Sequence, residues 1–163
     1  MGGGIAEVSA KAGVDVIVYE PTEEFAAGSK KRITASLDKA VEKGKLVAED
    51  RDAALGRLTF TTVLTDLADR QLVIEAIVED ETVKAKLFAE LDAIITDPTA
   101  VLASNTSSIP IMKIAAATKN PQRVLGLHFF NPVPVLPLVE LVATLVTNEN
   151  AVTAVAEFAG QTL

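Results

Sequence analysis

Short apolar runs rich in β-branched residues alternate with helical patterns along this chain of 163 residues. Runs of strand length lie at residues 14–19, 57–63, 71–77, 100–103, 123–130 and 137–143. Helical patterns occupy residues 4–12, 22–43, 49–55, 82–95, 110–118 and 147–163. Strands that alternate with helices predict βαβ units with right-handed crossovers. We therefore expect an α/β fold with a mainly parallel sheet.

Composition excludes several classes of protein. A hydrophobic content of 49% with only 4% aromatic residues predicts an aliphatic core. The net charge of −7 argues against a general nucleic-acid binder, because that role requires Lys and Arg to neutralise phosphates. Without cysteine there are no disulfides and no thiolate metal site, and no apolar run reaches the roughly 18 residues of a membrane span. We expect a cytoplasmic protein without nucleic-acid or membrane partners.

Polar segments follow four of the predicted strands. They are Glu20, residues 75–79, residues 104–108 and residues 128–131. In a parallel sheet the carboxyl ends of the strands meet at one edge, and ligands bind beyond that edge. We therefore expect these four segments to form one ligand site.

A glycine cluster at residues 2–4 precedes a helix, and the next strand ends at Glu20. This order resembles the second half of a dinucleotide fingerprint, in which glycines admit a diphosphate and the acid binds ribose hydroxyls. An acid at this place favours NAD over NADP, because it repels a 2′-phosphate. The alternative is that three glycines at a chain start are a tag remnant or a disordered segment.

His128 is the only histidine, and Glu140 follows it 12 residues later across a proline-rich turn. A carboxylate bonded to one ring nitrogen fixes the tautomer and raises the basicity of the other nitrogen. Asn131 can add an amide to the same pocket, whereas one histidine without cysteine predicts no metal site. The alternative is a core histidine with satisfied hydrogen bonds. For residues 104–108 the alternative is an ordinary helix-capping turn.

Four segments together carry a family resemblance, and they cover essentially the whole chain. They are GGGIA (residues 2–6), IEAIVE (residues 74–79), ASNTSS (residues 103–108) and GLHFFNPVPV (residues 126–135). In this order they resemble the 3-hydroxyacyl-CoA dehydrogenases, in the version of the 3-hydroxybutyryl-CoA dehydrogenases. The resemblance implies a Rossmann-type doubly wound fold and NAD as the cofactor.

The resemblance also implies a role for each site residue. The catalytic residues would be His128 as acid/base, Glu140 as its pairing carboxylate, and Ser107 and Asn131 at the substrate's 3-oxygen and the nicotinamide end. The NAD-binding residues would further include Gly2, Gly4, Glu20, Glu79 and Lys84. Substrate binding would add Ser36 and Lys43, which match positions that contact coenzyme A in the family. For Ser36 and Lys43 the alternative is a solvated helix face.

The implied reaction is oxidation of a short-chain L-3-hydroxyacyl-CoA to the 3-oxoacyl-CoA with NAD, or the reverse reduction. Two alternatives remain open: a 3-hydroxyacid dehydrogenase acting on a non-CoA substrate, and a non-catalytic NAD-binding fragment. Residues 1–163 would be an NAD-binding domain truncated at both ends. The resemblance implies that the first strand and a C-terminal helical dimerisation domain are absent, the parent being a homodimer. We therefore expect a gap in the sheet, weak NAD binding and little turnover from this chain alone.

Overall fold

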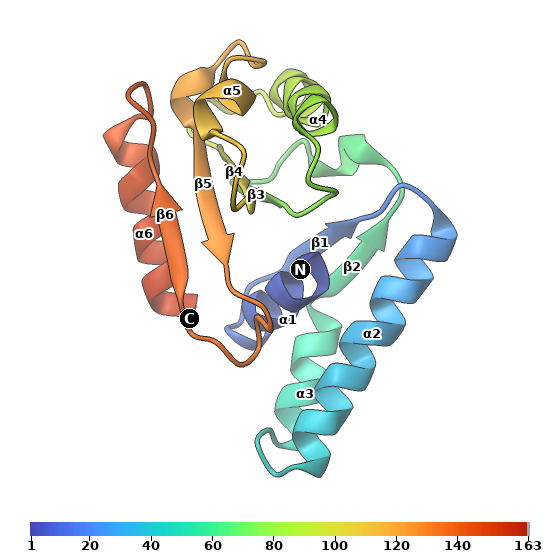
Figure 1. Cartoon of the computed structure of the whole chain (residues 1–163). Coiled ribbons are helices and arrows are strands. Elements are labelled where there is room, and N and C mark those ends of the chain that lie inside the picture. The colour runs from blue at the N-terminus through green and yellow to red at the C-terminus, as the bar shows by residue number, and fades with distance from the viewer. Residues whose placement is uncertain (163) are drawn as a thin grey trace.

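The computed structural model describes residues 1–162 (Figure 1). Its elements, with η for short 3-10 helices, are α1 (Gly2–Lys11), β1 (Val16–Tyr19), α2 (Glu23–Glu42), α3 (Ala48–Gly56), β2 (Leu58–Thr61), η1 (Leu64–Leu67), β3 (Leu72–Glu75), α4 (Glu81–Ile94), β4 (Val101–Ser104), α5 (Ile111–Ala115), η2 (Pro121–Arg123), β5 (Val124–Phe129), β6 (Val139–Val142) and α6 (Glu149–Thr162). This order confirms the predicted alternation of strands and helices.

The strands form two sheets rather than one. β1 pairs in parallel with β2, and the second sheet has the order β3-β4-β5-β6. Its first three strands are parallel, while β6 runs antiparallel to β5. Figure 1 shows the β1–β2 pair set apart from the larger sheet. The predicted gap in a mainly parallel sheet is therefore confirmed: among the described residues, β1 and β3 do not pair.

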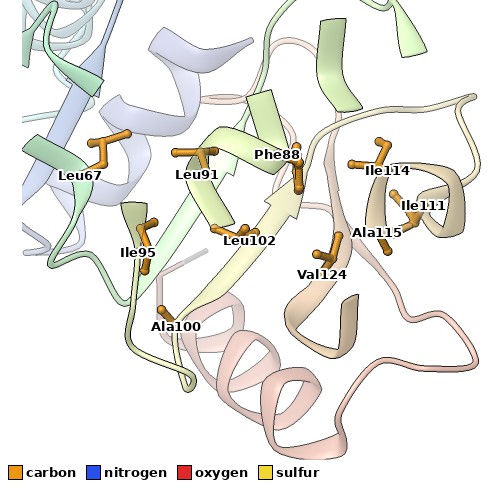
Figure 2. Packing of buried hydrophobic residues seen from close by; sticks show 10 residues of the cluster. All are labelled: Leu67, Phe88, Leu91, Ile95, Ala100, Leu102, Ile111, Ile114, Ala115 and Val124. Atoms are coloured by element: carbon orange, nitrogen blue, oxygen red, sulfur yellow. The ribbon is translucent and has the colours of Figure 1, made fainter. Parts of the chain in front are cut away.

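Helices cover both faces of the larger sheet, as a doubly wound fold requires. On one face, α4 and α5 pack their apolar side chains against β4 and β5 (Figure 2). On the other face, α1 and α6 pack against the same two strands. Successive residues of a strand point to opposite faces, so Leu102 joins the first cluster while Val101 and Ala103 join the second. The strand β4 is thus buried on both sides.

Helix α1 packs against both sheets. Its residue Ile5 belongs to the cluster on the larger sheet, whereas Ala6 and Ala10 pack with Ile33 and Leu37 of α2 over the β1–β2 pair. Because small side chains at positions 6 and 10 allow close approach, α1 and α2 can lie against each other. Helix α1 therefore lies between the two sheets and beside α2.

Two helix faces differ from the sequence-based prediction. Apolar periodicity places Phe25 on the buried face of α2, but its side chain is 56% exposed. The same periodicity places Val83 on the buried face of α4, but it is 46% exposed, whereas Lys84, Phe88 and Leu91 are almost fully buried. Thr22 and Asp80 cap the two helices, since they accept hydrogen bonds from amides three residues on.

A buried ion pair joins α4 to the segment before β5. The Arg123 guanidinium donates to the Asp92 carboxylate at 2.7 and 2.9 Å, and both side chains are almost fully buried. Arg123 also donates to the carbonyls of Ile95 and Asp97. Burial alone would raise the pKa of Asp92, but the hydrogen bonds it receives, chiefly from Arg123, hold that pKa below its ordinary value.

Candidate active site

His128 and Glu140 lie directly opposite each other on the antiparallel strands β5 and β6. The His128 Nδ1 atom lies 2.9 Å from Glu140 Oε2, so the predicted pair is in contact. In the neutral tautomer that donates from Nδ1, the Nε2 atom is left as a proton acceptor. The Phe130 ring packs against the imidazole at a centroid distance of 4.7 Å. The imidazole is thus oriented by a carboxylate and an aromatic ring.

Asn105 ties the loop after β4 to the strands on either side. Its side-chain Oδ1 accepts a hydrogen bond of 2.8 Å from the amide of Phe129, the residue after His128. The backbone amide of Asn105 donates to the backbone carbonyl of Glu75 at 2.8 Å. Because both bonds run between adjacent strands, the polar loop of residues 104–108 is held close to the histidine.

A buried carboxylate lies beneath this loop. Glu75, at the end of β3, is almost fully buried and accepts from Lys84 Nζ at 2.6 Å and from Ser104 Oγ at 2.7 Å. The amide of Ile77 also donates to it, at 2.7 Å. The Lys84 side chain is 1% exposed and contacts Glu79 Oε2 at 3.3 Å as well. Lys84 is therefore held under the loop by two carboxylates.

Glu79 is the more exposed partner in this network. Its carboxylate accepts hydrogen bonds from the hydroxyls of Thr106 and Ser108. Desolvation alone would raise the pKa of Glu79, but these hydroxyls and the Lys84 ammonium outweigh it and lower the pKa to about 2. Glu79 is therefore anionic at neutral pH.

A cavity of about 410 Å³ lies at the amino end of α1, and we call it the α1–α2 cavity. Its lining includes residues 2–4 of α1, Glu20 after β1, Ser29, Arg32 and Ser36 of α2, and Ala76 after β3. No side chain caps the α1 amino end, so its first amides are directed into this region. The cavity thus combines a free helix N-terminus with a carboxylate at a strand end.

Within the cavity, Glu20 is held by a hydroxyl relay. The Ser29 hydroxyl donates to Glu20 Oε1, and Arg32 Nη2 donates to Ser29 Oγ at 2.8 Å. A second acid, Glu7, also lines the cavity and is almost fully buried. Its burial raises the pKa of Glu7, and Ser36 is the hydrogen-bonding partner that opposes this rise.

The proline-rich segment that carries the histidine packs onto α1. A Cβ atom at Gly4 would lie 3.0 Å from the Cβ of Val133 and 3.5 Å from Pro134. Any larger residue at position 4 would therefore push the segment away from the helix. This contact places the residues after β5 next to the α1–α2 cavity.

The structure brings the predicted site residues together in two groups. Gly2, Gly4, Glu20 and Ser36 line the α1–α2 cavity. The second group lies at the carboxyl ends of β3, β4 and β5 or on the elements beside them. It consists of Glu79, Lys84, Ser107, His128 and Glu140. Ser107 and Asn131 are exposed. Lys43 lies at the far end of α2, outside the cavity lining.

Sequence reasoning missed Arg32 and Ser29, and it placed Asn105 and Glu75 in the predicted polar segments without giving either residue a role. Arg32 and Ser29 resemble any polar positions of a surface helix, and no sequence signal separates them. Asn105 resembles a turn residue, although its place directly after a buried strand was a usable signal. Glu75 had the clearest signal, because a carboxylate that ends an apolar strand requires a buried partner.

Comparison with known families decides what kind of domain this is. Residues 1–162 match the family model described as "3-hydroxyacyl-CoA dehydrogenase, NAD binding domain". The chain belongs to this family. Its Rossmann-type fold and NAD as its cofactor agree with the family's description. The resemblance seen in the four sequence segments is therefore confirmed.

Individual members of the 3-hydroxyacyl-CoA dehydrogenase family match the chain over nearly its full length. The chain is 68% identical to a 3-hydroxybutyryl-CoA dehydrogenase of Mycobacterium tuberculosis over 163 residues, which are 100% of the chain and 57% of the relative. The crystal structure of M. tuberculosis FadB2 has a TM-score of 0.97 and 68% identity, covering 98% of this chain and 56% of that one. The crystal structure of Escherichia coli 3-hydroxybutyryl-CoA dehydrogenase has a TM-score of 0.95 and 45% identity, with 99% and 34% covered.

The chain thus spans little more than half the length of the curated relatives it matches. None of the helices among the described residues combines the length and the apolar character needed to cross a bilayer. The division into domains, the homodimeric parent and the cytoplasmic location remain predictions.

Proposed function

We propose that this domain serves the NAD-dependent oxidation of an L-3-hydroxyacyl-CoA to the 3-oxoacyl-CoA, or the reverse reduction. The observation that carries the proposal is the contact of 2.9 Å between His128 Nδ1 and Glu140 Oε2 at the carboxyl edge of the sheet. The curated relatives that are named 3-hydroxybutyryl-CoA dehydrogenases support a short-chain substrate.

The α1–α2 cavity fits the adenosine and diphosphate part of NAD. Gly2 and Gly4 carry no side chain that would block the helix N-terminus, where a diphosphate is favoured. The amide of Gly4 already donates to the Met1 carbonyl at 2.9 Å, so the amides offered to a diphosphate are those that precede it. One carboxylate oxygen of Glu20 accepts a hydrogen bond from Ser29, and the other oxygen can accept hydrogen bonds from the ribose hydroxyls. When bound, NAD supplies the acceptor for the hydride that leaves C3 of the substrate. Ser107 and Asn131 are the proposed contacts at its nicotinamide end.

His128 would act as the acid/base of the reaction. Its Nε2 atom takes the proton of the 3-hydroxyl during oxidation and returns it during reduction. Glu140 stabilises the imidazolium that forms, as a carboxylate paired with Nδ1 does. Ser107 and Asn131 donate hydrogen bonds to the substrate oxygen. Positioned acid/base catalysis of this kind contributes roughly 10²–10⁴-fold in rate.

Glu79 and Lys84 would take different parts in cofactor binding. Glu79 is exposed enough to meet a ligand, whereas the Lys84 ammonium is enclosed by Glu75 and Glu79. We infer that Lys84 acts on the cofactor through Glu79, as a positioning residue.

The first prediction tests the acid/base pair in the protein that contains this chain. His128→Ala should lower kcat by about 10²-fold or more, and Glu140→Gln by less, because the histidine remains but loses its charge partner. The measurement follows NADH absorbance with acetoacetyl-CoA and, separately, the Kd for NADH. We expect the Kd to stay within a few-fold of the wild type. Near-normal turnover in the His128→Ala variant would contradict the proposal.

Ser36 and Lys43 distinguish a CoA thioester from a free hydroxyacid. If both contact coenzyme A, Ser36→Ala and Lys43→Ala should raise KM for acetoacetyl-CoA. Lys43→Ala should leave KM for NADH unchanged, because Lys43 lies outside the α1–α2 cavity that Ser36 lines. An unchanged KM for acetoacetyl-CoA would favour the alternative of a non-CoA substrate. The structure separates the two residues by seven positions along α2, which is roughly 10 Å at 1.5 Å per residue.

A further inference from the structure

Arg32 occupies a distinctive place in the α1–α2 cavity. Among the described residues that line this cavity, it carries the one cationic side chain. It lies on α2, three residues after Ser29, and its Nη2 donates to Ser29 Oγ at 2.8 Å. Ser29 in turn donates to Glu20. The guanidinium is therefore one hydroxyl away from the carboxylate proposed to bind the adenosine ribose.

Among the described residues no acidic side chain contacts Arg32 directly, and Glu20 reaches it only through the Ser29 hydroxyl. In the described part of the chain its guanidinium forms no ion pair. A guanidinium offers five N–H donors, and only its bond to Ser29 is formed here. The side chain is also exposed, so its remaining donors are accessible to a ligand. Such a group binds phosphate well, because its planar fork matches phosphate oxygens.

At this end of a dinucleotide, the phosphate that Arg32 could meet is the 2′-phosphate of NADP. Dinucleotide-binding domains use an acid here to bind the ribose of NAD, or a nearby arginine to accommodate the 2′-phosphate of NADP. This chain has both groups, joined by Ser29. The Glu20 carboxylate repels a phosphate, while Arg32 and the Ser29 hydroxyl would attract one.

We propose that Arg32 and Ser29 form a 2′-phosphate site that the Glu20 carboxylate keeps closed. Neutralising Glu20 opens the site, because the negative charge that repels a phosphate beside Ser29 and Arg32 is then removed. This inference rests on the proposed function, since it requires the cavity to bind the adenosine end of the dinucleotide.

The test measures Kd for NADH and NADPH by cofactor fluorescence with the protein that contains this chain. Glu20→Gln should tighten NADPH binding by at least about tenfold, the effect of one charge-assisted hydrogen bond gained. The same change should weaken NADH binding, because a carboxylate that accepts ribose hydroxyls is lost. Glu20→Ser is the second variant in case Glu20→Gln does not fold, which circular dichroism would reveal.

The double variant Glu20→Gln/Arg32→Ala isolates the arginine. It should lose the gain in NADPH affinity, whereas Glu20→Gln/Lys31→Ala should keep it. Lys31 is the matched control, because it is an exposed cation on the same helix but does not line the cavity. Equal loss in both double variants would overturn the inference, since helix charge in general would then explain the gain.

The remaining outcomes are also decisive. If the wild type binds NADH but Glu20→Gln gains no affinity for NADPH, the inference fails and the proposed function stands. If the double variant with Arg32→Ala binds NADPH as tightly as Glu20→Gln, Arg32 has no part in the site. If the wild type does not bind NADH, the proposed function fails, and the inference fails with it.

Discussion

Lys84 is buried among carboxylates, and this burial makes it a stability determinant. Its ammonium lies 2.6 Å from Glu75, and both side chains are only 1% exposed. Lys84→Met would leave the Glu75 carboxylate buried without its cation. We expect this variant to lose about 3–5 kcal/mol of unfolding free energy, as when one partner of a buried ion pair is removed. Urea denaturation followed by circular dichroism measures the loss.

A double variant distinguishes the contribution of the Lys84–Glu75 ion pair to stability from the contribution of side-chain packing. In Lys84→Met/Glu75→Gln no buried charge is left unpaired, so part of the lost stability should return. A single Lys84→Met variant as stable as the wild type would show that water or a rearranged loop compensates for the missing ammonium.

At the residue scale, sequence reasoning located the His128–Glu140 contact because residues of these types are rare in this part of the chain. His128 was identifiable because no other histidine exists, and Glu140 because it interrupts an apolar run. Ser29 and Arg32 were not identifiable, because a serine and an arginine on a helix look alike whether they face solvent or a cavity. Only the packing of α2 against α1 and β1 decides that they line the cavity.

Gly4 sets how closely the proline-rich segment can pack on α1. Gly4→Ala would place a Cβ 3.0 Å from that of Val133, and relieving this contact costs about 1–3 kcal/mol. The better helix propensity of alanine returns at most about 1 kcal/mol. We therefore expect a net loss of unfolding free energy on the order of 1 kcal/mol, measured by thermal and urea denaturation.

Gly3→Ala is the matched control for this contact. Its added Cβ would meet Ile33 at 3.5 Å, an ordinary van der Waals distance. With no clash to offset the gain in helix propensity, this variant should be as stable as the wild type or more so. Equal destabilisation of the two variants would mean that the helix start, rather than the Val133 contact, requires glycine.

Element order was predictable from sequence, whereas the buried face of α4 was not. The periodicity of apolar residues located the helix, but its buried face includes Lys84 and Asp92. A pattern of apolar positions assigns charged residues to solvent. These two are buried because Glu75 and Arg123, which lie on other elements, provide opposite charges. Such pairing depends on the tertiary structure.

The whole molecule should lose stability as the pH falls below about 4.5. In the folded state the pKa of Glu79 is lowered from 4.5 to about 2, and that of Asp92 is lowered from 3.8. A lowered folded-state pKa contributes stability above the unfolded-state value, and this contribution disappears as pH falls through the folded-state value. Thermal unfolding between pH 7 and pH 2 should therefore show a falling Tm that begins near pH 4.5.

Glu7 has the opposite linkage and supplies a control. Because its pKa is raised by burial, it favours the folded state most at low pH and opposes it as the pH rises above its ordinary value. Glu7→Gln should therefore raise Tm at pH 7 more than at pH 3. A larger increase at pH 3 would contradict the assigned direction.

The split between the two sheets has a consequence for cooperativity. The strands β1 and β2 come from residues 16–61, and β3 to β6 from residues 72–142, so each sheet is built from one continuous stretch. Without a shared backbone ladder in the described part of the chain, each sheet can open as its own foldon. The α1–α2 cavity is lined by residues that follow both β1 and β3. A dinucleotide bound there would stabilise both foldons at once and couple their opening.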